Sequence, residues 1–85
     1  MAEGQGVKIT ITYCAECGYE AQTLELAKTL MLEFGARLSC IELIPWEGGT
    51  FDVSLDGDLL HSMTREGGFP KPAAITDAVR ARLSA

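Results

Sequence analysis

The periodicity of the chain changes at two cysteines, Cys14 and Cys17, which are separated by two residues. Before them, over residues 7–13, β-branched apolar residues alternate with polar ones, and this pattern predicts a strand. After them, over residues 19–34, apolar residues recur at helical spacing, and Gly35 follows as a candidate cap for the helix end. The fold is therefore expected to begin with a strand that enters a helix through a C-x-x-C motif.

The next segment, residues 37–44, begins as an alternating strand in which Leu38 and Cys40 share one face. The alternation slips over residues 41–44, which predicts either a β-bulge or an early end of the strand. A proline and two glycines over residues 45–49 then predict a loop.

A hairpin is predicted over residues 51–62, because two alternating strands flank the dipeptide Asp56-Gly57, which is typical of a two-residue turn. Residues 64–71 are predicted to form a loop. Pro72 is then well placed as the first residue of a second helix, whose apolar residues share one face.

The predicted order β-α-β-β-β-α describes an α/β (α+β) fold with a four-stranded mixed sheet and two helices. A right-handed crossover makes the first two strands parallel, and the tight turn makes the last two antiparallel. If the third strand lies beside the first, the segments 14–18, 45–49 and 63–70 meet at one edge of the sheet. Residues 1–6 are expected to be a flexible tail before a single domain over residues 7–85.

The charge balance narrows the range of partners. The chain of 85 residues carries 7 basic and 12 acidic residues, for a net charge of -5, which disfavours nucleic acid and anionic membrane surfaces. No segment has the pattern of a signal peptide or of a membrane span of about 18 apolar residues. Three cysteines do not make a secreted disulfide scaffold, so we expect a reducing, cytoplasmic setting.

The C-x-x-C motif is expected to carry the chemistry, with Cys14 and Cys17 as catalytic residues. A turn of two residues lets their sulfurs bond, and the start of the following helix favours a thiolate, which is the nucleophile in disulfide exchange. Glu16 opposes this effect, because a carboxylate disfavours a second negative charge nearby. Half of a zinc site and two structural thiols are the alternatives, and the position between strand and helix favours redox chemistry.

Cys40 and His61 could complete a Cys3His zinc site with the motif. We favour no metal, because Cys40 lies inside a predicted strand, where a free cysteine usually packs as a small buried hydrophobe. His61 is expected near the end of the fourth strand, on the side where the loops converge. We expect it to be a partly exposed surface residue, with the tuning of a thiol as the alternative.

Three aromatic residues are candidates for an apolar rim that would dock a peptide or glutathione. Tyr19 follows the cysteine segment, and Trp46 and Phe69 fall in the two loops that are expected to converge on it. Simple capping of the core is the alternative for these side chains.

The order of the motifs is more specific than C-x-x-C alone. The motifs occupy residues 13–19 (YCAECGY), 49–53 (GTFDV), 56–57 (DG), 60–62 (LHS) and 68–70 (GFP). With this order and spacing, the chain resembles the selenoprotein W-like family, also called Rdx or SelT/SelW/SelH, from about residue 7 to residue 83.

The resemblance implies a thioredoxin-like fold and a redox role that is linked to glutathione. It also implies that the position of Cys17 is often selenocysteine in relatives. His61, Phe69 and Pro70 belong to the matching segments, and together with Tyr19 and Trp46 they are our candidates for substrate or partner binding.

We therefore expect a thiol–disulfide redox protein, a candidate oxidoreductase, whose partner is glutathione or a protein thiol or disulfide and which binds no cofactor tightly. The choice between Cys14 and Cys17 as the attacking thiol stays open, as does the choice between turnover and sensing. The alternative functions are a redox-sensitive protein-interaction module and, less favoured, a metal-binding protein. The chain is expected to be a monomer or a weak homodimer.

Overall fold

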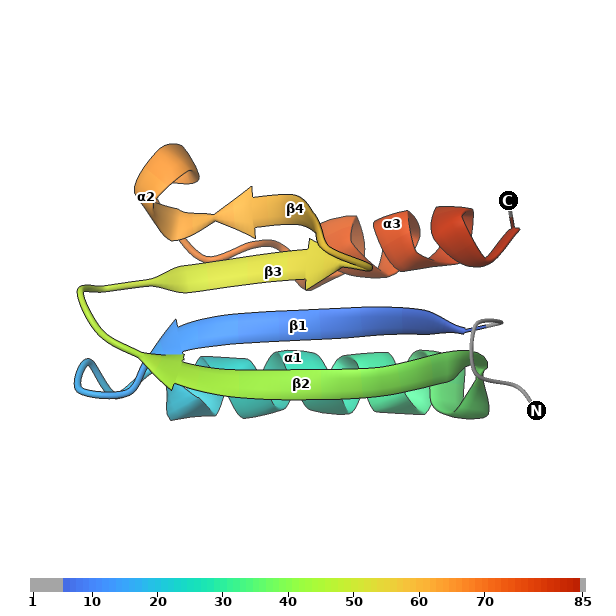
Figure 1. Ribbon diagram of the computed structural model, residues 1–85, viewed down its shortest axis with the longest axis horizontal. Helices are drawn as coiled ribbons and strands as arrows, with labels where there is room; N and C mark the ends of the chain where they lie inside the picture. Colours follow the sequence, from blue (N-terminus) through green and yellow to red (C-terminus); the bar gives the residue numbers. More distant parts are fainter. Residues whose placement is uncertain (1–5, 85) are drawn as a thin grey trace.

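A computed structural model describes residues 6–84 of the chain (Figure 1). The order of strands and long helices is the predicted one, with one further short helix and a single 3₁₀ turn at Gly35–Arg37. The strands are β1 (Val7–Cys14), β2 (Leu38–Trp46), β3 (Phe51–Leu55) and β4 (Asp58–Ser62), and the helices are α1 (Glu20–Phe34), α2 (Met63–Glu66) and α3 (Pro72–Ser84).

The four strands form one mixed sheet in the order β2-β1-β3-β4. β1 runs parallel to β2 and antiparallel to β3, and β3 runs antiparallel to β4. The prediction of a mixed sheet with the third strand beside the first is therefore confirmed. Because of this topology, β1, β2 and β4 end at the same edge of the sheet, and β3 begins there (Figure 1).

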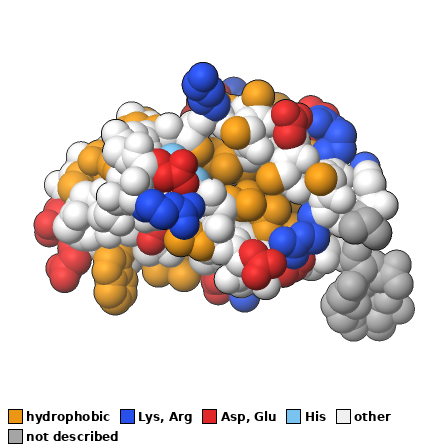
Figure 2. Space-filling view, turned by 90° about the horizontal axis from the view of Figure 1, so that it is seen from above, with side chains coloured by type: hydrophobic (Ala, Val, Ile, Leu, Met, Phe, Trp, Pro, Cys, Tyr) orange, Lys and Arg blue, Asp and Glu red, His pale blue; other side chains and the backbone are white. Residues whose placement is uncertain are grey.

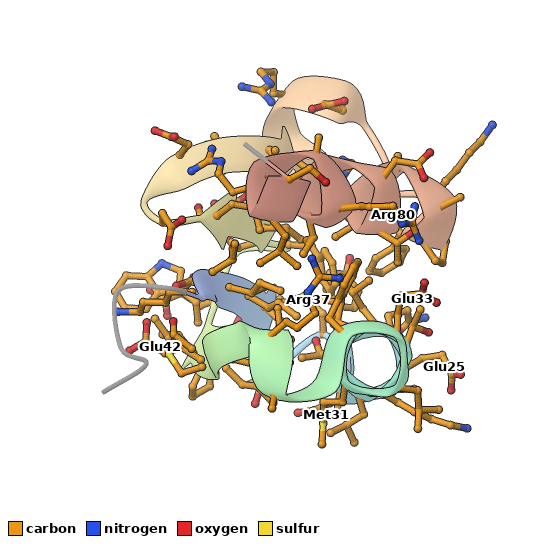
Figure 3. The ribbon with its side chains drawn as sticks, turned by 90° about the vertical axis from the view of Figure 1, so that its right-hand side faces the viewer. Glu25, Met31, Glu33, Arg37, Glu42 and Arg80 are labelled. Carbon is orange, nitrogen blue, oxygen red and sulfur yellow. A yellow bond between two sulfur atoms is a disulfide. The ribbon has the colours of Figure 1, made fainter. Side chains whose placement is uncertain are left out.

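Both long helices cover the same face of the sheet and contact each other (Figure 1). Their apolar stripes pack on the alternating residues of β1 and β3, and burial of this apolar area is the main favourable term in folding. Arg80 of α3 and Glu33 of α1 face each other across the two helices and form an ion pair of 2.9 Å (Figure 3). The core consists of Val7, Ile9, Ile11, Leu26, Leu30, Phe34, Phe51, Val53, Leu55, Ile75 and Val79.

The β3–β4 turn has the predicted geometry. Asp56 and Gly57 have φ of 49° and 88°, and positive φ at both central residues is the mark of a type I′ turn. The carboxylate of Asp56 accepts a hydrogen bond of 2.9 Å from the backbone N–H of Lys8. This contact ties the turn to the start of β1.

Strand β2 differs from the prediction at both ends. It continues through Trp46, so the expected loop over residues 45–49 begins later. Pro45 is tolerated in β2 because this is an edge strand, where a missing N–H need not break the ladder. The irregularity in register lies opposite Val7 and Lys8, which makes Ser39 the extra residue, rather than one of residues 41–44.

The shift at Ser39 also corrects the prediction for Cys40. Leu38 pairs with the buried Val7, whereas Cys40 pairs with the exposed Lys8. The two residues therefore do not share a face, and Cys40 is exposed rather than part of the core.

The remaining corrections concern short segments. The loop predicted over residues 64–71 contains most of the short helix α2, which ends at Glu66 and is capped by Gly67 with φ of 80°. Of the expected tail over residues 1–6, residues 1–5 lie outside the described part of the chain, as does residue 85. Gly6 lies against the backbone of Arg37 and Ser39.

Candidate functional site

The three segments that were predicted to converge do meet at one edge of the sheet. The backbone N–H of Cys14 donates to the carbonyl of Thr50 at 2.8 Å, and that of Ala15 donates to the carbonyl of Trp46 at 3.0 Å. From the other side, the hydroxyl of Tyr19 donates to the sulfur of Met63 at 3.8 Å. The cysteine turn thus lies against the end of β2 (Figure 1), and Tyr19, which follows the turn, reaches the start of α2 through its side chain.

Cys14 and Cys17 form a disulfide, and their Cα atoms are 5.2 Å apart. The turn between them is closed by a hydrogen bond of 3.2 Å from the N–H of Gly18 to the carbonyl of Ala15. Gly18 has φ of 77°, a backbone conformation that favours glycine. The two cysteines differ in their exposure to solvent: Cys14 is completely buried, whereas Cys17 is exposed.

The helix begins later than the motif. The first residue of α1 is Glu20, and Tyr19 is its N-terminal flanking residue, so both cysteines lie in the turn before the helix. Because the effect of a helix dipole falls off within its first turn, the support that α1 gives to a thiolate is weaker than the motif alone suggests.

The expected aromatic rim is divided into two parts. Tyr19 and Phe69 pack edge to face with ring centroids 4.9 Å apart, and Phe69 contacts Phe51 in the same way at 5.0 Å. Phe51 is buried in the core, while Phe69 keeps 40% of its surface exposed. This part of the rim both caps the core and presents an aromatic face.

Trp46 forms the second part, at the end of β2, with 61% of its surface exposed. It borders a hollow of about 400 Å³ next to the cysteine turn. Glu16, which lies between the cysteines, contributes one wall, and Glu47 contributes another. The complete lining is Ala15, Glu16, Pro45, Trp46 and Glu47.

His61 was expected to be partly exposed, but only 8% of its surface is accessible. Its Nε2 lies 2.6 Å from the carbonyl oxygen of Gly68, and since a carbonyl only accepts, Nε2 carries the hydrogen. Its Nδ1 lies 3.9 Å from a carboxylate oxygen of Glu66. A hydrogen bond from Arg65 holds the pKa of Glu66 below its ordinary value. Through its contacts with Gly68 and Glu66, His61 therefore holds the segment between β4 and α3 in place.

His61, Phe69 and Pro70 line a second hollow, of about 360 Å³, between β4 and α3. On the face seen in Figure 2, apolar side chains gather in the middle and charged side chains surround them. Pro70 therefore lines the same hollow as Phe69 and His61. The hollow beside the cysteine turn has a different lining, which includes Trp46.

The zinc alternative finds no support in the geometry. Cys40 pairs with Lys8, whereas Trp46, six residues further along β2, pairs with Cys14. At about 3.3 Å per residue, Cys40 lies roughly 20 Å from the motif. Within residues 6–84, no three histidine, cysteine or acidic side chains are grouped so that they could hold a metal ion.

Two residues of the site, Glu47 and Met63, lie in segments that were expected at this edge, but they were not singled out from the sequence. Glu47 lines the same hollow as Glu16, and the sulfur of Met63 accepts a hydrogen bond from Tyr19. The position of Glu47 directly after Trp46, inside the converging segment 45–49, is the signal that could have found it. In the described part of the chain, none of the helices has the length and apolar character that a membrane crossing requires.

Comparison with known proteins places these features in a family context. A family model described as the Rdx family matches residues 8–81. Migration and invasion enhancer 1 from Bos taurus is 37% identical over 79 residues, which are 91% of this chain and 65% of that protein. Selenoprotein W from Mus musculus is 32% identical over 81 residues, which are 89% of this chain and 92% of that protein.

Solved structures show the same architecture. The selenoprotein W-related protein from Vibrio cholerae superposes with a TM-score of 0.87 at 27% identity, over 92% of this chain and 98% of that one. A protein from Bordetella parapertussis superposes with a TM-score of 0.86 at 32% identity, over 92% and 99% of the two chains. The expected thioredoxin-like fold is thereby confirmed.

Proposed function

Because the chain belongs to the Rdx family, we propose that it is a thiol–disulfide redox protein in which Cys14 and Cys17 alternate between a dithiol and a disulfide. The pair sits in a turn whose backbone hydrogen bonds hold the two Cα atoms 5.2 Å apart. A C-x-x-C pair in such a turn needs little rearrangement to open or close.

We base the roles of the attacking and the resolving thiol on the difference in burial between the two cysteines. Cys17 is exposed and can meet a substrate sulfur, whereas Cys14 is completely buried behind it. We assign Cys17 as the attacking thiol and Cys14 as the resolving thiol. The family resemblance points the same way, since it implies that selenocysteine often occupies the position of Cys17.

The cycle balances as an ordinary exchange. The Cys17 thiolate attacks a substrate disulfide, forms a mixed disulfide and releases one substrate thiol. Cys14 then attacks the sulfur of Cys17, closes the internal disulfide and releases the second thiol. The dithiol gives two electrons to the substrate disulfide, and its two protons end on the released thiols. Glutathione is our proposed co-substrate for the return step, in which two glutathione thiols are oxidised to one disulfide.

The roles can be tested by single substitutions, with Cys40→Ser as the background because Cys40 is exposed and would react as well. Cys14→Ser leaves Cys17 alone, and Cys17→Ser leaves Cys14 alone. Each reduced variant is mixed with a neutral dipyridyl disulfide, and the released thione is followed by absorbance. Cys17 is expected to react at least about tenfold faster, because a buried thiol reacts only during local opening.

The same variants unfolded in urea provide the control, since the two thiols should then react at similar rates. Equal rates in the folded protein would contradict the assignment of roles. A chain that forms no internal disulfide in a mildly oxidising glutathione buffer would contradict the proposed function itself. A cytoplasmic location and a glutathione link remain part of the proposal.

A further inference from the structure

The hollow beside the cysteine turn has a charge that bears on which substrates can approach. Its lining contains the carboxylates of Glu16 and Glu47, and no lysine or arginine is among its five residues. Within residues 6–84, neither carboxylate takes part in an ion pair. The whole chain, these two carboxylates included, has a net charge of -5. A cation is therefore attracted to this hollow and an anion is repelled.

The remaining surface of the hollow suits a long basic side chain. Trp46 has 61% of its surface exposed at the rim, and its ring can stack on a guanidinium or on the methylene groups of a lysine. With a volume of about 400 Å³, the hollow has room for such a side chain.

The position of the hollow connects this charge to the redox pair. Ala15 and Glu16, which form part of its wall, are the two residues between the cysteines. The hydrogen bond of 3.0 Å from the N–H of Ala15 to the carbonyl of Trp46 fixes the turn against the end of β2. A substrate whose sulfur meets Cys17 thus places its neighbouring residues near Glu16 and Glu47.

We propose that the substrate is a cysteine, as thiol or disulfide, in a cationic peptide segment whose lysine or arginine binds between Glu16 and Glu47 against Trp46. This inference rests on the proposed function, since it names the substrate class of the same site. Glutathione, with two carboxylates and one ammonium group, is then the less favoured of the thiol substrates at this site.

The test compares three short peptides of equal length in which the cysteine is flanked by lysines, glutamines or glutamates. Each peptide is disulfide-linked to mercaptoethanol, and the reduced chain with Cys40→Ser is the reductant. Rates are measured by alkylation and mass spectrometry. Each rate is divided by the rate of dithiothreitol with the same peptide, because flanking charges also change the leaving-group thiol.

The expected order is lysine, glutamine, glutamate, with about tenfold between the extremes at low salt. At about 1 M salt, where charges are screened beyond roughly 3 Å, the ratio is expected to fall towards one. Glu16→Gln with Glu47→Gln is expected to remove most of the ratio. The ratio compares peptides within one variant, so a change in the reactivity of the Cys17 thiol itself cancels. The control, Glu42→Gln with Asp77→Asn, makes the same change in net charge outside the hollow and is expected to keep the ratio.

The possible outcomes distinguish a failure of the proposed substrate class from a failure of the proposed redox function. Exchange at equal corrected rates with all three peptides would overturn the substrate class and leave the redox function standing. Loss of the ratio to the same degree in the test and control variants would assign it to the net charge and overturn the role of the hollow. No exchange with any of the peptides would overturn the redox function and this inference with it.

Discussion

Gly6 occupies a position where a side chain has no room. A Cβ atom there would lie 2.6 Å from the backbone N of Ser39 and 2.7 Å from the carbonyl oxygen of Arg37. Backbone atoms cannot rotate away, so the bulge at the start of β2 would have to shift. We expect Gly6→Ala to lower the free energy of unfolding by about 1 to 3 kcal/mol, measured by urea denaturation.

Gly68 provides the matched control for this substitution. A Cβ atom at Gly68 would have no heavy atom within 4 Å, and its φ is not in the left-handed region. Gly68→Ala is therefore expected to be neutral or to stabilise by up to about 1 kcal/mol through the unfolded state. Equal losses of stability in the two variants would show that the close approach at Gly6 is not the cause.

At the scale of elements, the β3–β4 turn joins three parts of the chain through Asp56. One carboxylate oxygen accepts from the backbone N–H of Lys8 at 2.9 Å, and the other accepts from Arg82 of α3 at 3.4 Å. Asp56 also has φ of 49°. Asp56→Ala removes both contacts and places an unsuited residue in the left-handed region, so we expect a loss of about 1 to 3 kcal/mol in stability.

Asp56→Asn separates these contributions. Asparagine tolerates the same backbone conformation and keeps an oxygen for the N–H of Lys8, but it lacks the charge for Arg82. A loss of about 1 kcal/mol or less is expected, measured by thermal unfolding, because the pair with Arg82 is partly exposed. If the two variants were equally unstable, the charge of Asp56 would be its main contribution.

The elements also show which information the sequence carries. Alternation and helical spacing predicted β1, α1 and α3 well, because each buries one face against the same core. The end of β2 could not be predicted from Pro45, because the tolerance for proline depends on β2 being an edge strand. Likewise, the exposure of Cys40 follows from a bulge at Ser39, and a bulge is set by pairing with β1.

The site was predictable in position but not in detail. Topology alone brought the cysteine turn, the end of β2 and the segment after β4 to one edge. The burial of His61 depends on the carbonyl of Gly68, which its ring reaches at 2.6 Å, and no local pattern encodes that contact. The pairing of Glu16 with Glu47 in one hollow likewise depends on where β2 ends.

At the scale of the whole molecule, the redox pair lies at one end of the apolar cluster that forms the core, and Cys14 is completely buried there. The residues that fill this cluster come from β1, β3, α1 and α3, and Cys17 is outside it, on an exposed turn. A cycle between dithiol and disulfide requires that both forms stay folded. We expect the architecture to meet this requirement, because the ring that reduction would open is small and lies at one edge of the sheet, while the apolar cluster between helices and sheet includes neither cysteine.

The size of that ring sets the expected effect of reduction on stability. Closing so short a loop restricts the unfolded chain by about 2 kcal/mol, so the oxidised form, with Cys40→Ser to prevent other pairings, is expected to be more stable by that amount. By linkage, the disulfide of the folded chain should have a reduction potential lower than that of the unfolded chain by about 40 mV. Urea denaturation with and without a phosphine reductant measures the difference in stability, and glutathione titrations of the folded and urea-unfolded chain measure the shift in reduction potential.

The oxidised and the reduced form should each unfold in one cooperative transition. If the reduced chain showed none, the core alone would not hold the fold, and the dithiol half of the proposed cycle would have no folded protein to carry it.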